Sequence, residues 1–245
     1  MEKILIQDKL KEIGKEQQYF YGVSLHNFSK GESFEKYRSV LREIYDERLK
    51  EGFFFEGKYH ATKDLRPKAC EYDDSIIDVL VDSGIHQKMI DLFGYEMFLC
   101  HAQVRISFNQ QEFSYMPWHR DTYIYEDGIS SGPIPPMKKI IYYPKFNDID
   151  NTCLLLALGS HLKTKHVKSE DIQQLNHLPI TNIKNSTDQF VIFNTECLHH
   201  AVPPENKKQL RVIYSFCPVG QLDHHDDKTA YEKYMRRLDE DIYNK

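Results

Sequence analysis

The sequence predicts an all-β core with flanking helices, and three of its features support this fold class. Residues 95–218 contain short apolar and aromatic runs separated by turn residues, which is the pattern of an antiparallel β-domain. Before and after this stretch, apolar side chains recur three and four positions apart, which is the period of an amphipathic helix. Aromatic residues make up 13% of the 245 positions, a proportion that suits a thick β-core. We therefore expect a single domain over residues 1–245, with helices packed on one face of the sheets.

Residues 1–94 are expected to form a mainly helical lead-in. A stripe of apolar residues at helical spacing predicts a first helix over 34–49. A second helix is predicted to begin at the Asp and Ser cluster of 73–75, whose side chains suit a helix N-cap. A third is predicted over 86–93. A glycine follows each of these segments and suits a helix C-terminus.

Residues 95–218 are expected to form the β-core, and 219–245 a tail with a C-terminal helix. The predicted strands are 97–108, 139–143, 153–158, 189–193 and 210–216. In the tail, apolar residues return to helical spacing over 228–243.

Composition and charge exclude several function classes. The net charge is −5, and no basic stripe marks a nucleic-acid-binding face. The longest near-continuous apolar run, 153–158, is too short to span a bilayer, and the first ten residues lack the apolar core of a signal peptide. Five scattered cysteines without a Cys-x-x-Cys pair argue against disulfides and against a cysteine zinc site. We expect a cytoplasmic protein that binds neither nucleic acid nor a membrane and acts on a small molecule.

The histidines suggest a metal site. His119 and Asp121 are two positions apart, so in a strand both side chains point to one face. A third ligand is expected from the adjacent pair His199 and His200. Two histidines and one carboxylate form the facial triad of non-haem Fe(II) oxygenases, which leaves positions on the metal open. Two further His-x-Asp pairs within 224–227 are interpreted as a solvated polar link, because such a pair also arises by chance.

Arg211 follows this histidine pair and opens a predicted buried strand. A buried guanidinium needs an anionic partner. That partner is either a carboxylate of the protein or the carboxylate of a ligand bound to the metal.

These elements, taken in order, resemble the phytanoyl-CoA dioxygenase-like branch of the Fe(II)/2-oxoglutarate-dependent oxygenases, over most of the chain. The segments that carry the resemblance are the helical stretch 73–93, Trp118-His119-Arg120-Asp121, the strand 139–143, Gly159-Ser160-His161, and 188–193 followed by His199-His200-Ala201 and Arg211. The order and spacing of separated elements make the resemblance more specific than any one motif.

The resemblance implies a double-stranded β-helix (a cupin-like jelly roll) that holds Fe(II) through His119, Asp121 and His199. Counting forward from the preceding strand favours His199 as the distal ligand, whereas counting back from Arg211 favours His200 as the alternative. The co-substrates implied are 2-oxoglutarate, bound by Arg211, and O2. The implied reaction hydroxylates an aliphatic carbon of a small-molecule metabolite and releases succinate and CO2; desaturation and ring formation are related outcomes. The presence of Asp121 argues against halogenation.

Further residues are candidates for co-substrate binding. Arg105, Asn109 and Thr122 lie near the metal motif in the sequence, although Arg105 equally suits a structural ion pair. Where the family often has a serine after the distal histidine, this chain has Ala201, so Ser215 or a tyrosine is expected to compensate, unless Arg211 suffices.

Two alternatives remain. The first is a jelly roll that binds a metal without redox chemistry, such as a cupin-like isomerase or a sensor. The second is a binding or structural module in which the histidines are incidental.

Overall fold

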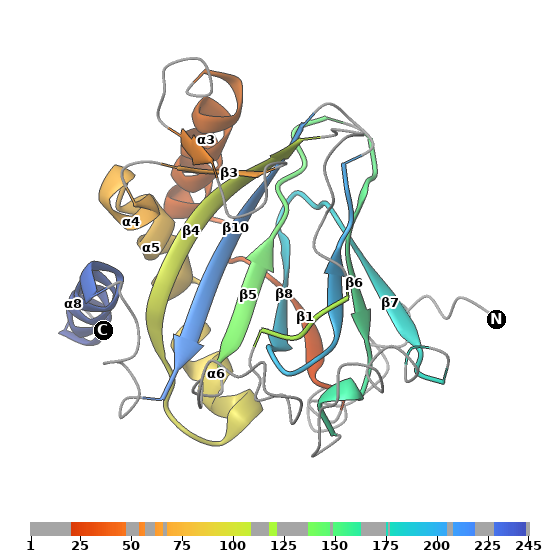
Figure 1. The fold of residues 1–245 in the computed structure, drawn as a ribbon. Coiled ribbons are helices and arrows are strands. Elements are labelled where there is room, and N and C mark those ends of the chain that lie inside the picture. The colour runs from red at the N-terminus through yellow and green to blue at the C-terminus, as the bar shows by residue number, and fades with distance from the viewer. Residues whose placement is uncertain are drawn as a thin grey trace.

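Two antiparallel β-sheets face each other, and helices cover the outer face of the larger sheet (Figure 1). The structure is a computed structural model. It describes residues 21–47, 62–65, 68–108, 118–121, 137–147, 149–162, 175, 177–204, 208–218 and 228–243, and the backbone of 54–56.

The larger sheet has seven strands and the smaller has three. In spatial order the larger contains β1 (Val23–Asn27), β8 (Gln189–Asn194), β5 (Lys138–Tyr142), β10 (Lys208–Cys217), β4 (Phe98–Phe108), β3 (Thr62–Leu65) and β2 (Phe54–Glu56). The smaller contains β7 (Ile180–Lys184), β6 (Thr152–Ala157) and β9 (His199–Ala201). Every strand pair is antiparallel. This arrangement is a jelly roll, so the predicted fold class is confirmed.

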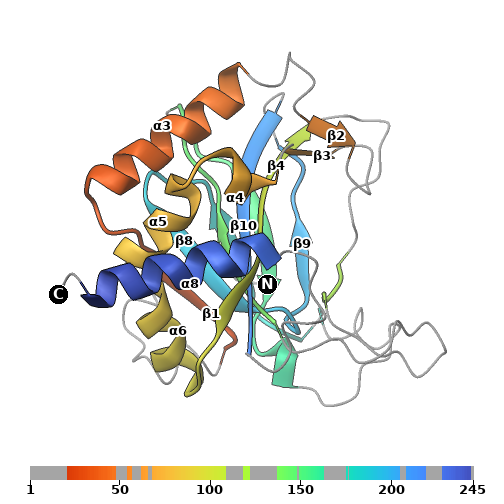
Figure 2. The same ribbon diagram turned by 90° about the vertical axis from the view of Figure 1, so that its left-hand side faces the viewer.

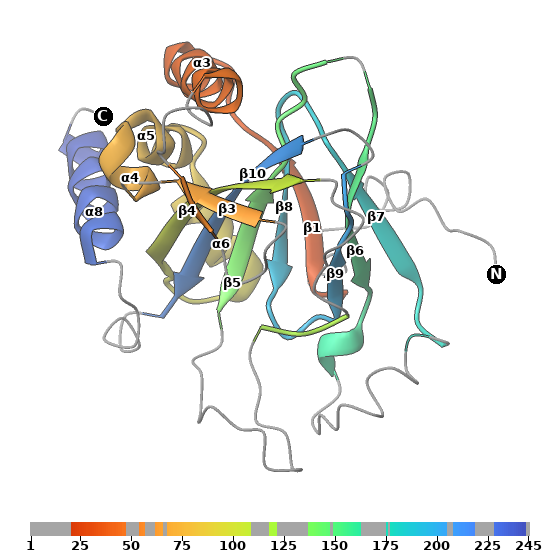
Figure 3. The same ribbon diagram turned by 45° about the horizontal axis from the view of Figure 1, so that its top comes forward.

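Strand alternation separates two hydrophobic cores. On β5, Ile140 and Tyr142 face the helices, whereas Ile141 packs with side chains of the smaller sheet. The register of β10 continues this pattern, because Tyr214 pairs with Ile140 and Ile213 pairs with Ile141. Successive side chains of a strand point to opposite faces, so the central strands supply both cores. The inner core, which includes Ile141, lies between the two sheets, and Figure 3 shows the two sheets separately. The outer core, which includes Ile140 and Tyr142, lies between the larger sheet and the helices.

The helices form one layer over the larger sheet (Figure 2). They are α3 (Glu32–Asp46), α4 (Ala69–Tyr72), α5 (Ser75–Asp82), α6 (Ile85–Phe93) and α8 (Lys228–Tyr243). The 3-10 turn η2 (Ser160–Leu162) is not part of this layer and follows β6 of the smaller sheet. The stripe on α3 is buried as its spacing predicts, and Gly94, at φ 78°, ends α6 in the left-handed conformation that glycine favours. None of the helices in the described part of the chain is both long and apolar enough to cross a membrane.

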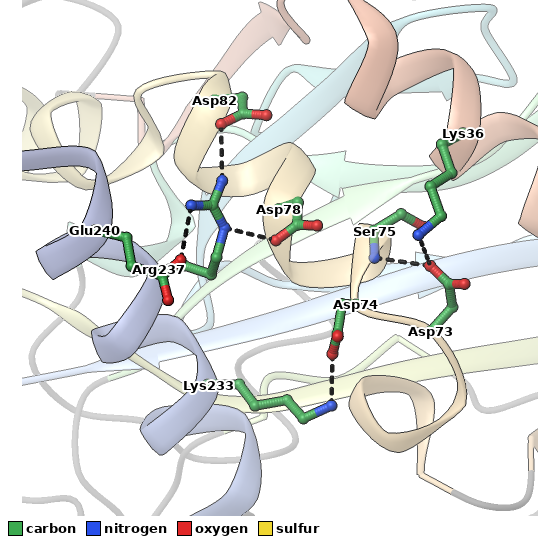
Figure 4. A network of polar contacts seen from close by, with 9 residues as sticks. All are labelled: Lys36, Asp73, Asp74, Ser75, Asp78, Asp82, Lys233, Arg237 and Glu240. Carbon is green, nitrogen blue, oxygen red and sulfur yellow. Dashed lines mark hydrogen bonds and ion pairs between the residues drawn. The ribbon is translucent and has the colours of Figure 1, made fainter. Parts of the chain in front are cut away.

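The C-terminal helix docks through buried apolar residues and a rim of ion pairs (Figure 4). Tyr234 of α8 is fully buried in the outer core. Around it, Arg237 Nε lies 2.7 Å from a carboxylate oxygen of Asp78, and Lys233 Nζ lies 2.6 Å from one of Asp74. The last helix is therefore fixed to α5.

The segment before residue 95 is less helical than its periodicity predicts. It contributes β1, β3 and β2 to the larger sheet, and β1 pairs with β8 from Val23 opposite Phe193 to Asn27 opposite Gln189. These strands have only three to five residues, so their local pattern is weak, and pairing with strands far along the chain decides their state. The sequence also does not predict β7 or β9, which are equally short.

Candidate metal centre

His119, Asp121 and His199 lie together at one end of the space between the sheets. Each offers a ligand atom, and the three atoms lie within 4.8 Å of one another. His119 Nε2 is 3.6 Å from Asp121 Oδ1, and His199 Nε2 is 3.4 Å from Asp121 Oδ2. Two imidazole nitrogens and one carboxylate oxygen form a donor set that suits a divalent transition metal, Fe(II) among them.

Backbone hydrogen bonds hold the two ligand-bearing segments together. The N–H of His119 donates to the carbonyl of His199 at 3.0 Å, and that of His199 donates to the carbonyl of His119 at 2.8 Å. The N–H of Asp121 donates to the carbonyl of Thr195 at 3.0 Å. His119 thus forms an isolated antiparallel bridge with His199 of β9, and Asp121 is bonded to the turn after β8, so backbone hydrogen bonds bring together ligands about 80 residues apart in the chain.

The structure distinguishes the two adjacent histidines. His199 is 5% exposed and stacks edge-on against Phe193. His200 is on the opposite face of β9, where its ring lies 5.9 Å from that of Trp118. Because neighbouring side chains of a strand point apart, His199 joins the cluster and His200 does not.

Ser160 and His161 support the segment that carries His199. The Ser160 hydroxyl donates to the carbonyl of Ala157 at 2.6 Å and accepts the N–H of Leu198 at 2.8 Å. His161 Nδ1 lies 3.5 Å from the Cys197 sulfur. Gly22, at φ 73°, packs against the side chains of His161 and Cys197, and a Cβ at this position would come within 2.6 Å of the Cys197 sulfur. The Gly-Ser-His element therefore stabilises the segment 197–199, which carries the candidate metal ligand His199.

Lys139 is a residue of the cluster that the sequence analysis missed. Its Nζ lies 2.7 Å from Asp121 Oδ2. Burial by itself raises the pKa of Asp121, but Lys139 and the two histidines more than offset this and hold that pKa well below its usual range. The sequence does carry a signal for Lys139. Side chains alternate between the two faces of a strand, so Lys139 shares a face of β5 with Ile141, which belongs to the inner core.

Arg211 and Arg105 sit side by side, paired in register between β10 and β4. Arg105 forms a two-pronged ion pair with Asp64 of β3, at 2.5 and 2.8 Å. Arg211 has no such carboxylate partner among the described residues, and its buried Nε makes no hydrogen bond there.

Tyr143, at the end of β5, lies beside Arg211. Burial raises the pKa of Tyr143 to about 12, and the charge of Arg211 opposes this rise. The Tyr143 hydroxyl is also buried, and its contact with the Arg211 guanidinium is too loose to form a well-made hydrogen bond. Two neighbouring buried polar groups thus keep unused hydrogen-bonding capacity in one place, which is the environment that an anionic ligand satisfies.

The remaining four candidates have two outcomes. Asn109, Thr122 and the 224–227 pairs lie outside the described residues. Ser215, opposite Lys139 on β10, is buried and its carbonyl accepts a hydrogen bond from the Cys100 thiol.

Fold and site together define a jelly roll with a two-histidine, one-carboxylate cluster between its sheets. No protein-family model matches the chain, and no curated protein sequence matches it. Several solved structures, in contrast, match most of the chain. The non-haem α-ketoglutarate-dependent epimerase SnoN of nogalamycin biosynthesis aligns with a TM-score of 0.64 at 13% identity, over 91% of each chain.

Two further structures align in the same way. The α-ketoglutarate-dependent carbocyclase SnoK, also of nogalamycin biosynthesis, gives 0.61 at 12% identity, over 85% of each chain. HygX from Streptomyces hygroscopicus, with nickel, 2-oxoglutarate and hygromycin B bound, gives 0.57 at 11% identity, over 84% of this chain and 88% of its own. At these identities the likeness establishes the fold.

Proposed function

We propose that this protein is an Fe(II)- and 2-oxoglutarate-dependent oxygenase that acts on a small molecule. The observation that carries the proposal is the cluster of His119, Asp121 and His199. Three ligands on one side of a metal leave positions open for a co-substrate and O2. The fold neighbours agree with this class, since HygX holds nickel and 2-oxoglutarate and SnoN has been solved with Fe3+ and α-ketoglutarate. Within the class, motif order favours the phytanoyl-CoA dioxygenase-like branch.

The residues present fit 2-oxoglutarate. The co-substrate carries a carboxylate at each end, and Arg211 with Tyr143 offers unsatisfied donors inside the same inter-sheet space as the metal cluster. A guanidinium and a hydroxyl together bind a carboxylate by charge-assisted hydrogen bonds. Tyr143 thereby takes the place of the serine that the family often has after the distal histidine.

Each residue then has a defined task. His119, Asp121 and His199 would hold the metal, and Arg211 with Tyr143 would orient the far carboxylate of the co-substrate. When bound, Fe(II) with 2-oxoglutarate and O2 would supply the oxidation of an aliphatic C–H bond, with one oxygen atom going to the substrate and the other to succinate as CO2 is released. The aromatic and aliphatic side chains of the inner core, such as Phe193 and Val191, exclude water from this space.

We propose hydroxylation as the outcome, although neighbours of the same fold include an epimerase and a carbocyclase.

The main rival is a metal-binding jelly roll without redox chemistry. It would use the same three ligands but would leave the unpartnered donors of Arg211 and Tyr143 without a purpose. A buried unsatisfied guanidinium nitrogen is costly, so its presence favours a carboxylate-bearing ligand.

The test is anaerobic addition of Fe(II) and then 2-oxoglutarate to the purified protein. We expect a visible metal-to-ligand charge-transfer band in the unmodified protein, no band in His119→Ala, and a weakened band in Arg211→Ala. A folded, iron-loaded protein that gives no band would overturn the oxygenase proposal and favour the non-redox rival.

A further inference from the structure

The contact between Lys139 and Asp121 assigns a role to a residue outside the ligand set. The two charged groups approach to 2.7 Å, and both side chains are largely buried, at 19% and 17% exposed. Buried charges at this distance interact much more strongly than a surface pair. Asp121 is the one hydrogen-bond or ion-pair partner of Lys139 among the described residues.

The two oxygens of Asp121 have different surroundings. Oδ1 faces His119 Nε2 at 3.6 Å. Oδ2 faces His199 Nε2 at 3.4 Å and also accepts the hydrogen bond from Lys139. One oxygen is therefore engaged by a lysine, and the other is not.

Asp121 is held from two sides. Its backbone N–H donates a hydrogen bond to the carbonyl of Thr195, on the loop after β8. Lys139 reaches it from β5, where its neighbours in register are Phe193 on β8 and Ser215 on β10. Because Lys139 stands on a central strand, the sheet fixes its backbone, and the ion pair with Asp121 holds its ammonium group.

We propose that Lys139 is a positioning residue that keeps Asp121 Oδ2 away from the metal. The carboxylate then offers the metal a single oxygen, Oδ1. This inference rests on the proposed function, since a chelating co-substrate and O2 together need three open positions. A carboxylate that bound through both oxygens would leave one position fewer.

The opposite effect of Lys139 is also physically conceivable. An ammonium group near a divalent cation repels it, so a lysine that competed with the metal would weaken its binding. The two roles predict different results when the lysine is replaced. Competition predicts tighter metal binding with unchanged coordination, whereas positioning predicts a change in coordination.

The experiment counts the waters on bound Mn(II) in the absence of 2-oxoglutarate. Water-proton relaxivity of the Mn(II)-loaded protein reports this number. We expect Lys139→Met to lose about one third of the inner-sphere relaxivity, as one of three open positions closes. Lys139→Arg, which keeps a charged donor, is expected to restore it. Mn(II) affinity, from electron paramagnetic resonance of free Mn(II), should fall or stay the same, because losing a contact that supports a ligating carboxylate does not strengthen metal binding.

A second measurement links the lysine to the co-substrate. In anaerobic Fe(II) protein, Lys139→Met should bind 2-oxoglutarate at least about tenfold more weakly than the unmodified protein, from titration of the charge-transfer band. The matched control is Lys145→Met, which removes a lysine from the surface pair with Asp150, 2.6 Å apart, and should change neither readout. Circular dichroism verifies folding, and Lys139→Gln replaces the methionine variant if that variant does not fold.

The failures of the two proposals are distinguishable. If the unmodified protein binds Mn(II) but gives no charge-transfer band with Fe(II) and 2-oxoglutarate, the proposed function fails, while the relaxivity change still tests Lys139. Unchanged relaxivity in Lys139→Met overturns the positioning role, and a tenfold gain in Mn(II) affinity with unchanged relaxivity establishes competition instead.

Discussion

The Nδ1 atom of His199 lies 2.9 Å from the carbonyl oxygen of Cys197. A carbonyl only accepts hydrogen bonds, so the proton of a neutral His199 ring is on Nδ1, and the lone pair of Nε2 faces Asp121. Such contacts fix the tautomer and direction of metal-binding histidines. Strand alternation therefore selects His199 over His200, and the Cys197 carbonyl then directs Nε2 of His199 toward the cluster.

Replacing each histidine separately tests this choice. We expect His199→Ala to weaken Ni(II) or Co(II) binding by more than about 100-fold, because losing a ligand costs more than losing a supporting contact. His200→Ala should keep the affinity within a few-fold, since that ring lies against Trp118. Isothermal titration calorimetry measures both. The reverse order of effects would assign the ligand role to His200.

Tyr143→Phe separates co-substrate binding from stability. The variant should bind 2-oxoglutarate about tenfold more weakly, because it loses one hydrogen bond to a carboxylate. Its free energy of unfolding should stay equal or rise slightly, since the removed hydroxyl is buried without a well-made hydrogen bond among the described residues. Charge-transfer titration and urea denaturation measure the two effects. A clear loss of stability would show that the hydroxyl has a structural partner.

The ion pair of Arg105 and Asp64 is expected to serve stability. Asp64→Ala should lower the free energy of unfolding by about 3 kcal/mol, because it leaves a largely buried guanidinium without its counter-ion. The double variant Asp64→Leu with Arg105→Met should regain most of this loss in urea denaturation. If Arg105→Met instead abolishes the charge-transfer band in a stable protein, Arg105 binds the co-substrate.

The docking of α8 depends more on its buried tyrosine than on its ion pairs. Arg237→Ala removes contacts to Asp78, Asp82 and Glu240 that are partly exposed (Figure 4), so we expect a loss of only about 1 kcal/mol. Tyr234→Ala leaves a cavity in the outer core and should cost about 3 kcal/mol or more. Thermal unfolding ranks the two variants, and equal effects would contradict this assignment.

The pKa of His161 predicts a pH dependence of stability. Burial, together with the positive charges of Lys138 and Arg120, lowers this pKa to about 4 in the folded protein. In the unfolded chain a histidine has a pKa of about 6.5. Between these values the unfolded state binds the proton and the folded state does not, so stability falls as the pH drops from about 6.5 to about 4.

His161→Gln should reduce this loss. The measurement is urea denaturation of both proteins at pH 7.5 and at pH 5 (roughly the middle of the window). The difference between the two pH values should be smaller in the variant, whose side chain does not titrate. Equal differences would mean that His161 is accessible to protons in the folded state.

The sequence by itself determined the elements whose local pattern is long. The apolar stripe of α3 and the strands β4 and β10, of 11 and 10 residues, appear where periodicity predicts them. The His-x-Asp spacing also brings His119 and Asp121 toward one place, because residues two positions apart in an extended segment point to the same side, which is a purely local relationship.

Tertiary structure alone decided what depends on contacts between distant segments. β1 is a strand because β8 is there to pair with it, and His199 joins the cluster because β9 lies beside residue 119. Lys139 reaches Asp121, and Tyr143 reaches Arg211, only because the fold places the segments that carry them next to one another. Local spacing carries no information about such pairings, since the energy that selects them comes from packing and hydrogen bonds made after the sheets assemble.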